Sequence, residues 1–210
     1  MNETKFTANE ISLVALFAAL TAVGGFIRVP IPYVPLTLQT LMVMYSGLFL
    51  GARLGAMSQL VYLVIGLLGL PVFAYGGGIG YVLQPTFGYL LGFIPGAYSL
   101  GKLTERKKKL SIPFLAFAIF VCILNIYFLG TLYLYANILF IQHKEISMSL
   151  AVKIGCLAPL PADLLKLVLV AATGPRLREK ISIYLPAQGN SSVRLHGLVY
   201  SGHERIKNVK

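Results

Sequence analysis

The sequence predicts an all-α integral membrane protein with six transmembrane helices. Hydrophobic residues make up 57% of the 210 residues and charged residues only 12%, and the mean hydropathy is +0.77. Such a composition is far too apolar for a soluble domain of this length. Charges are also confined to a few places, because residues 11–101 contain only Arg28 and Arg53 and Leu110–Gln142 contains none. Segments of hydrocarbon length therefore follow one another almost without a break.

Proline and glycine residues divide this apolar sequence into helical segments. We expect the first segment to be kept as a helix rather than removed as a signal peptide, because it runs on into more membrane sequence. The second and third are joined by a few residues around Gly51, which predicts a tight helical hairpin. The predicted helices are Asn9–Arg28, Leu36–Leu50, Leu54–Leu70, Tyr81–Lys102, Pro113–Gln142 and Pro161–Thr173.

The last predicted helix is unusually short. A helix of about 13 residues spans roughly 20 Å, whereas a hydrocarbon core is about 30 Å thick. Pro161–Thr173 should therefore begin inside the membrane, after an amphipathic or re-entrant segment at Ser147–Leu157. We expect residues 1–180 to form one membrane domain and residues 181–210 to form a poorly ordered cytoplasmic tail.

The distribution of basic residues predicts the orientation. Six spans place Lys5, Arg53, the run Lys102–Lys109 and the basic residues of Arg176–Lys180 on one side, and Arg28, Lys144 and Lys153 on the other. The side with the larger number should be cytoplasmic, which puts both termini there. The lysine run fits a topology signal with a secondary contact to anionic lipid. No nucleic-acid-binding motif accompanies it, so the net charge of +11 does not indicate a nucleic-acid partner.

Asp163 and Lys166 interrupt the last apolar segment and are the strongest candidates for a site. A charge near the bilayer centre costs from about 2.5 to well over 10 kcal/mol, so such residues usually face a partner, a cavity or a ligand. A spacing of three residues puts both side chains on one helix face. If Pro161 is the first helical residue, the helix dipole also favours the negative charge of Asp163. The alternative is an ion pair that only holds helices together.

Two loops predicted on the non-cytoplasmic side are rich in residues that control backbone conformation, proline in one and glycine in the other. Residues 29–39 contain three prolines, which fix φ and prevent helix, and residues 70–80 contain four glycines, which permit positive φ. A phosphate-binding loop is disfavoured, because no strand precedes Gly76 and Tyr81 stands where a dinucleotide fingerprint needs glycine. We expect a lid over an apolar pocket, with a plain flexible connection as the alternative.

Four segments in the same order resemble the BioY family: Pro30–Thr40, Gly66–Ala74, Pro85–Phe93 and Pro161–Lys166. Members of that family are the biotin-capture (S) components of energy-coupling-factor (ECF) transporters. The resemblance implies a six-helix S-component bundle in the bacterial plasma membrane. It also implies an outward-facing vitamin pocket that the first and third loops close.

The same resemblance implies roles for individual residues. Asp163 is suited to accept hydrogen bonds from the ureido N–H groups of biotin. Lys166 would balance that charge and donate to the ureido oxygen or, in another pose, to the valeryl carboxylate. The other candidate substrate-binding residues are neutral: Gln39 and Thr86 as hydrogen-bonding groups, Tyr89, Tyr75 and Phe73 as ring walls, and Gly77 in the glycine-rich loop.

The first helix carries two overlapping small-residue repeats, formed by Ala15, Ala18, Ala19 and Ala22. Small side chains four residues apart let another helix pack closely in lipid. They serve either an internal contact or, as the resemblance implies, docking of the transmembrane coupling subunit. The chain lacks the Gly-x-x-x-x-Gly-Lys-Ser/Thr motif, so ATP-driven uptake would need separate ATPase subunits.

Enzymatic functions find little support in the sequence. The three histidines have no ligand spacing to one another or to the two cysteines, so neither a metal site nor another cofactor is expected. Asp163 is the only aspartate, which argues against a paired-aspartate hydrolase. Beside a biotin-capture component, two interpretations stay open: a component of the same class for another vitamin, such as thiamine or riboflavin, and a non-transport membrane scaffold.

Overall fold

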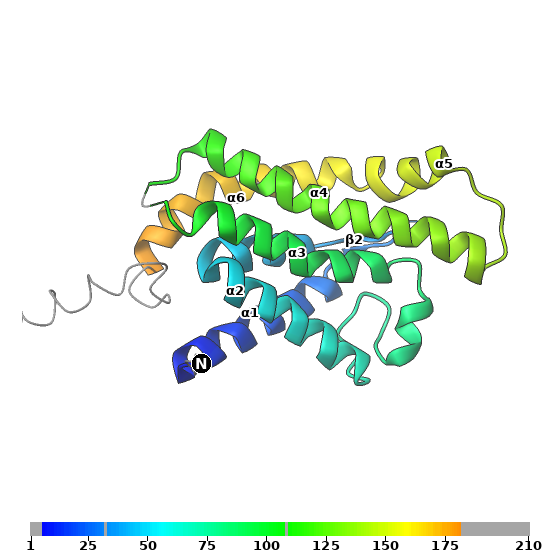
Figure 1. The fold of residues 1–210 in the computed structure, drawn as a ribbon, viewed down its shortest axis with the longest axis horizontal. Coiled ribbons are helices and arrows are strands. Elements are labelled where there is room, and N and C mark those ends of the chain that lie inside the picture. The colour runs from blue at the N-terminus through cyan, green and yellow to red at the C-terminus, as the bar shows by residue number, and fades with distance from the viewer. Residues whose placement is uncertain (1–5, 32, 108, 182–210) are drawn as a thin grey trace, which may run out of the picture.

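The computed structural model describes residues 6–31, 33–107 and 109–181. Apart from Ile181, which ends the last helix, the predicted tail lies outside the described residues. The chain forms one bundle of packed helices, which confirms the predicted all-α class (Figure 1). Its main helices are α1 (Ala8–Phe26), α2 (Gln39–Leu67), α3 (Phe87–Thr104), α4 (Ile112–Ala136), α5 (Met148–Val152) and α6 (Leu160–Ile181).

Four helical stretches in the described part of the chain are long and apolar enough to cross a membrane. They are Ala8–Phe26, Gln39–Leu67, Ile112–Ile141 and Met148–Lys180. Helix α3 is not among them, but it packs along both α2 and α4. Small residues permit this close packing, because a Cβ at Gly92 would lie 2.8 Å from the backbone of Ile126 and one at Gly47 would lie 2.6 Å from the carbonyl of Ala97.

Helix α2 is two antiparallel halves joined at Gly51, as the predicted hairpin requires. Gly51 has φ +81° and ψ −174°, a conformation that glycine adopts without steric cost. Beyond the turn, a Cβ at Gly55 would lie 3.0 Å from Gly47, and Gln59 Nε2 donates to Ser46 Oγ at 3.0 Å. The carboxylate of Glu105 accepts from the backbone N–H of Ala52 at 3.1 Å and so caps the start of the second half.

The first predicted loop is a short hairpin of strands. β1 (Arg28–Val29) pairs antiparallel with β2 (Leu36–Thr37), so helix α2 begins at Gln39 rather than at the predicted Leu36. The fourth predicted helix, Tyr81–Lys102, begins only at Phe87 as α3, because η1 (Ile79–Leu83) is a separate 3₁₀ turn and Pro85 precedes α3. The segments that precede α2 and α3 both contain residues that line the cavity described below, Thr37 and Thr86 respectively.

The prediction of a short last helix is wrong. α5 continues through π-helical turns, η3 (Lys153–Leu157), and only two residues separate η3 from α6, so the whole stretch Met148–Lys180 is 33 residues long. The predicted re-entrant segment is part of this helix. Asp163 lies in the first turn of α6, as predicted, and its backbone N–H donates to Pro159 O at 3.2 Å.

Pro159 explains why the sequence predicted a break where the structure has a nearly continuous helical stretch. A proline has no N–H for the carbonyl four residues earlier, which normally ends or kinks a helix. Here that carbonyl belongs to Gly155, and it accepts a hydrogen bond from the Tyr89 hydroxyl at 2.6 Å. Helix α3 thus replaces the missing donor, and the backbone passes the proline without an unsatisfied buried group.

The two alanine repeats of α1 face different surroundings. Ala18 is 4% exposed and packs within the core, and Ala22 is half-buried. Ala15 and Ala19 are exposed and lie on the side of α1 that faces away from the bundle. One repeat therefore serves internal packing, while the other presents small side chains to the exterior.

Candidate ligand-binding site

A cavity of about 50 Å³ lies where β2, the start of α2, α3, α4 and α6 meet. It is bounded on one side by the segment 34–37 and on another by residues from the segment between α2 and α3. Its apolar lining includes Val34, Leu36, Ala74, Leu90, Phe93 and Ile126. Its polar lining consists of Thr37, Gln39, Thr40, Thr86, Asp163 and Lys166, with Tyr81, Tyr89 and Tyr127. A mostly apolar pocket with a few converging polar groups is typical of small-molecule sites.

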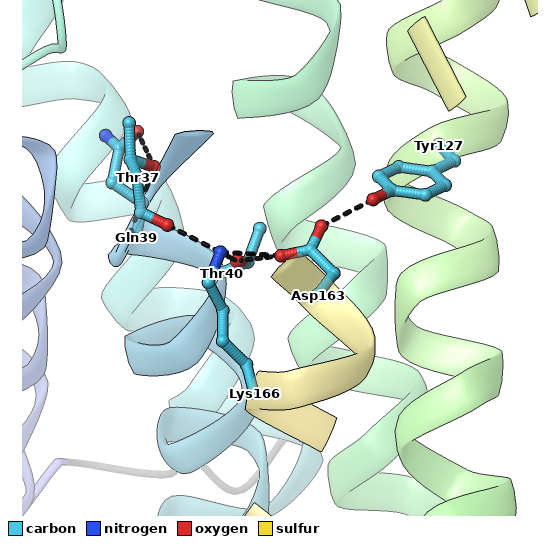
Figure 2. Close-up of polar contacts among 6 residues, drawn as sticks. All are labelled: Thr37, Gln39, Thr40, Tyr127, Asp163 and Lys166. Carbon is cyan, nitrogen blue, oxygen red and sulfur yellow. Dashed lines mark hydrogen bonds and ion pairs between the residues drawn. The ribbon is translucent and has the colours of Figure 1, made fainter. Parts of the chain in front are cut away.

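The predicted charged pair lies in this cavity as a buried ion pair. Lys166 Nζ is 2.6 Å from Asp163 Oδ1, and the two side chains are 11% and 5% exposed. The ammonium also donates to the backbone carbonyl of Thr37 at 2.6 Å and to Thr40 Oγ1 at 2.9 Å (Figure 2). All three ammonium donors therefore have acceptors.

The Asp163 carboxylate is held equally well. Oδ1 also accepts from the Thr40 hydroxyl at 2.8 Å, and Oδ2 accepts from the Tyr127 hydroxyl at 2.6 Å (Figure 2). Helices α2 and α4 thus both supply donors to a carboxylate on α6. Charge-assisted bonds of this kind are about twice as strong as neutral ones and offset the desolvation of the pair.

Replacing Tyr127 by Phe should weaken ligand binding roughly tenfold. The change keeps the ring but removes a charge-assisted hydrogen bond to Asp163, a contact worth about 1.5–3 kcal/mol. Isothermal titration of the purified protein with its ligand measures the effect. Tyr98→Phe is the control, since Tyr98 is exposed and does not line the cavity. Equal affinities for Tyr127→Phe and the unaltered protein would contradict the prediction.

Tyr89 occupies a slot that two glycines create. A Cβ at Gly130 would lie 2.3 Å from the Tyr89 ring, and one at Gly155 would lie 2.6 Å from the Tyr89 hydroxyl. Both distances are too short for any other residue at those positions without movement of the ring. The two glycines therefore hold Tyr89 in the wall of the cavity.

Gly130→Ala is accordingly expected to displace the Tyr89 ring and to break its bond to Gly155. Overpacking of this kind costs about 1–3 kcal/mol of stability, and ligand affinity should fall with it. Thermal unfolding in detergent and ligand titration measure the two effects. Gly80→Ala is a matched control, because no atom lies within 4 Å of its Cβ position. An unchanged melting temperature for Gly130→Ala would contradict this role.

The structure brings together five of the eight predicted substrate-binding residues. Asp163, Lys166, Gln39, Thr86 and Tyr89 line the cavity. Phe73, Tyr75 and Gly77 do not, and a separate packing contact accounts for each.

Those three residues shape the segment between α2 and α3. Phe73 is 1% exposed and packs between the rings of Tyr62 and Tyr81. Tyr75 is exposed, and the Arg28 guanidinium lies 5.1 Å from its ring centre. A Cβ at Gly77 would lie 2.0 Å from the carbonyl oxygen of Leu70, so this position requires glycine. Phe73 supports the cavity from behind, because the Tyr81 ring that it contacts lines the cavity.

Sequence reasoning did not identify several residues that line the cavity. Thr40 lies one residue after Gln39, and its hydroxyl gave no signal of its own. Tyr127 is one of 12 tyrosines and lies in a segment without charges. A polar hydroxyl in an uncharged apolar helix could have marked Tyr127 as a candidate. Tyr133 and Tyr135 lie in the same helix, however, and the sequence does not separate them from Tyr127. In the described ranges, no three His, Cys, Asp or Glu side chains come together as a metal site.

Known proteins resemble this chain over most of its length. The model of the BioY family matches residues 1–183. A probable biotin transporter BioY from Lysinibacillus sphaericus is 42% identical over 165 residues, 79% of this chain and 84% of the relative. The biotin transporter BioY from Thermotoga maritima is 36% identical over 166 residues, 78% of this chain and 92% of the relative.

A solved structure has the same fold. The crystal structure of the S-component for biotin from an ECF-type ABC transporter superposes with a TM-score of 0.71. The alignment covers 83% of this chain and 95% of that chain at 24% identity. Since the family model spans the whole membrane bundle and full-length relatives exceed 30% identity, the chain belongs to the BioY family.

Proposed function

We propose that this protein is the biotin-binding component of an uptake system, working with an ECF transmembrane coupling subunit and ATPase subunits. The observation that carries the proposal is the buried Asp163–Lys166 pair, which faces a cavity in a chain of the BioY family. The curated relatives are named biotin transporters, and the structural neighbour is an S-component for biotin.

The chemistry of the cavity suits biotin. The ureido group has two N–H donors and one carbonyl acceptor, which match the Asp163 carboxylate and the donors Lys166, Thr40 and Tyr127. The fused ring and valeryl chain are apolar, and they match the walls formed by Leu90, Phe93 and Ile126. The carboxylate accepts three bonds and has one lone pair left for a ligand N–H. Lys166, Thr40 and Tyr127 already donate their hydrogens, so each would have to give up a present bond in order to donate to the ligand.

We propose a six-pass topology with both termini in the cytoplasm of a bacterial cell. The six spans are α1, the two halves of α2, α3, α4 and the long stretch that ends with α6. The start of α1, the connection between α3 and α4 and the end of α6 lie at one end of the bundle (Figure 1). Arg53, Lys102–Lys107 and Arg176–Lys180 belong to this end, which supports a cytoplasmic assignment.

The cavity would then open toward the outside. Residues 34–37 and the segment 68–86 bound it, at the opposite end of the bundle from the α3–α4 connection and the end of α6 (Figure 1). A volume of about 50 Å³ holds a few waters but not a bicyclic vitamin. Binding would therefore require at least one of these segments to move, as the lid interpretation expects.

Binding of radiolabelled biotin to the purified protein tests the proposal. We expect nanomolar affinity, with competition by unlabelled biotin but not by thiamine or riboflavin. Competition by one of the other vitamins would assign a different substrate to the same site. Absence of any vitamin binding by folded protein would favour a non-transport scaffold and would refute the proposal.

A further inference from the structure

A buried tyrosine behind the cavity bonds both to the start of α2 and to the segment between α2 and α3. Tyr62, in the second half of α2, is 2% exposed and does not line the cavity. Its hydroxyl accepts a hydrogen bond from Gln39 Nε2 and donates to the carbonyl of Val72 at 3.1 Å. Gln39 follows the strand hairpin 28–37, and Val72 belongs to the segment 68–86.

These bonds fix the orientation of the Gln39 amide. A tyrosine hydroxyl has one proton to donate, and here Val72 O receives it, so the group that faces the hydroxyl must be the amide nitrogen. On the other side, Gln39 Oε1 accepts from Thr37 Oγ1 at 3.0 Å. One N–H and one lone pair of the amide are left to meet a ligand in the cavity that Gln39 lines.

Packing around Tyr62 leaves little room for another arrangement. The Tyr62 and Phe73 rings meet edge-on at 5.4 Å, and Phe73 lies 4.6 Å from the ring of Tyr81, which lines the cavity. A Cβ at Gly25 would lie 3.1 Å from both Gln39 Nε2 and Val72 O, so the end of α1 closes over the same junction.

We propose that Tyr62 is a positioning residue for the ligand site. Its hydroxyl holds the Gln39 amide in one orientation and links the start of α2 to Val72 in the segment 68–86, behind the cavity. This inference rests on the proposed biotin-binding function and adds to it a residue that does not touch the ligand. Without the hydroxyl, the amide can rotate by half a turn and offer an acceptor where a donor is needed.

A double-mutant cycle tests the proposal. Tyr62→Phe keeps the ring against Phe73 and removes the hydroxyl, and it should weaken biotin binding roughly fivefold with faster dissociation. In the background of Gln39→Met, the same change should cause no further loss, because the amide that it orients is gone. Tyr45→Phe is the control, since the Tyr45 hydroxyl pairs with Thr173 and the residue does not line the cavity.

Two results would overturn the role of Tyr62. One is unchanged affinity in Tyr62→Phe, and the other is an equal loss with and without Gln39, which would indicate general destabilisation. Should Tyr62→Phe fail to fold, Thr37→Val removes the opposite bond to the same amide, and additivity with Gln39→Met would again overturn the proposal. Failure of the unaltered protein to bind biotin would instead count against the proposed function.

Discussion

Asp163→Asn is expected to abolish high-affinity biotin binding. The substitution removes the proposed acceptor for the ureido group and leaves the Lys166 ammonium buried with only neutral acceptors, Thr37 O and Thr40 Oγ1. The lost charge-assisted bond to the ligand is worth about 1.5–3 kcal/mol, so an affinity loss of about ten- to a hundredfold is expected. Removing one partner of a buried ion pair also costs about 3–5 kcal/mol of folding stability. Lys166→Met should have a similar effect, since it leaves the carboxylate without its cation. Titration of purified protein with biotin measures both.

The double variant Asp163→Asn/Lys166→Met separates a ligand site from a structural brace. It leaves no unpaired charge in the bundle, so thermal stability should recover towards that of the unaltered protein while binding stays lost. Lys102→Met is the control. Lys102 forms an ion pair of the same i, i+3 spacing with Glu105 at 3.4 Å, but the Lys102 side chain is 52% exposed, so little stability depends on the pair. If the double variant bound biotin normally, the pair would be only a brace between helices.

Changing both Ala15 and Ala19 to Leu should eliminate association with the coupling subunit and leave biotin affinity unchanged. Both alanines are exposed and four residues apart, so a partner helix can approach the α1 backbone closely there. Leucine side chains at these positions would hold that helix away. They would not disturb the bundle, because neither side chain points into it. Co-purification of this protein with tagged coupling and ATPase subunits measures the effect.

Two other alanine-to-leucine changes serve as controls for the exposed face of α1. Ala172→Leu places the same added bulk on an exposed face of α6 and should leave the complex intact. Ala18→Leu should behave differently from both, because Ala18 is buried and overpacking costs about 1–3 kcal/mol of folding stability. Retained association after the double change at Ala15 and Ala19 would refute docking at this face.

Much of the helical pattern could be predicted from hydropathy. The first helix, the hairpin at Gly51 and the fifth predicted helix agree with α1, α2 and α4 to within a few residues, apart from the π-helical turns that end the last of these. The errors fall beside prolines. Those at positions 159 and 175 lie within or beside a continuous helix, whereas the one at 85 does precede a helix start. A sequence does not show whether another helix will satisfy the carbonyl that a proline leaves free.

The charged residues of the candidate site could be predicted from the sequence, but the neutral residues that bond to them could not. Asp163 and Lys166 could be identified because a charge in an apolar segment is costly wherever it lies. Thr40 and Tyr127, which hold that pair, could not, because one hydroxyl among many carries no such cost. Phe73, Tyr75 and Gly77 were predicted as binding residues from their loop, yet none of them lines the cavity, and each has a packing contact elsewhere.

The sequence by itself determined the membrane class, the family and the charged pair, since these follow from composition, motif order and the high cost of charge in lipid. Only the tertiary structure decided what each polar group bonds. The Tyr127 hydroxyl bonds to Asp163, and the Tyr62 hydroxyl bonds to Gln39. The Tyr89 hydroxyl bonds to the Gly155 carbonyl, which Pro159 leaves without its usual donor. The physical reason is that hydrogen bonds form over about 3 Å, and packing between helices sets which groups come that close.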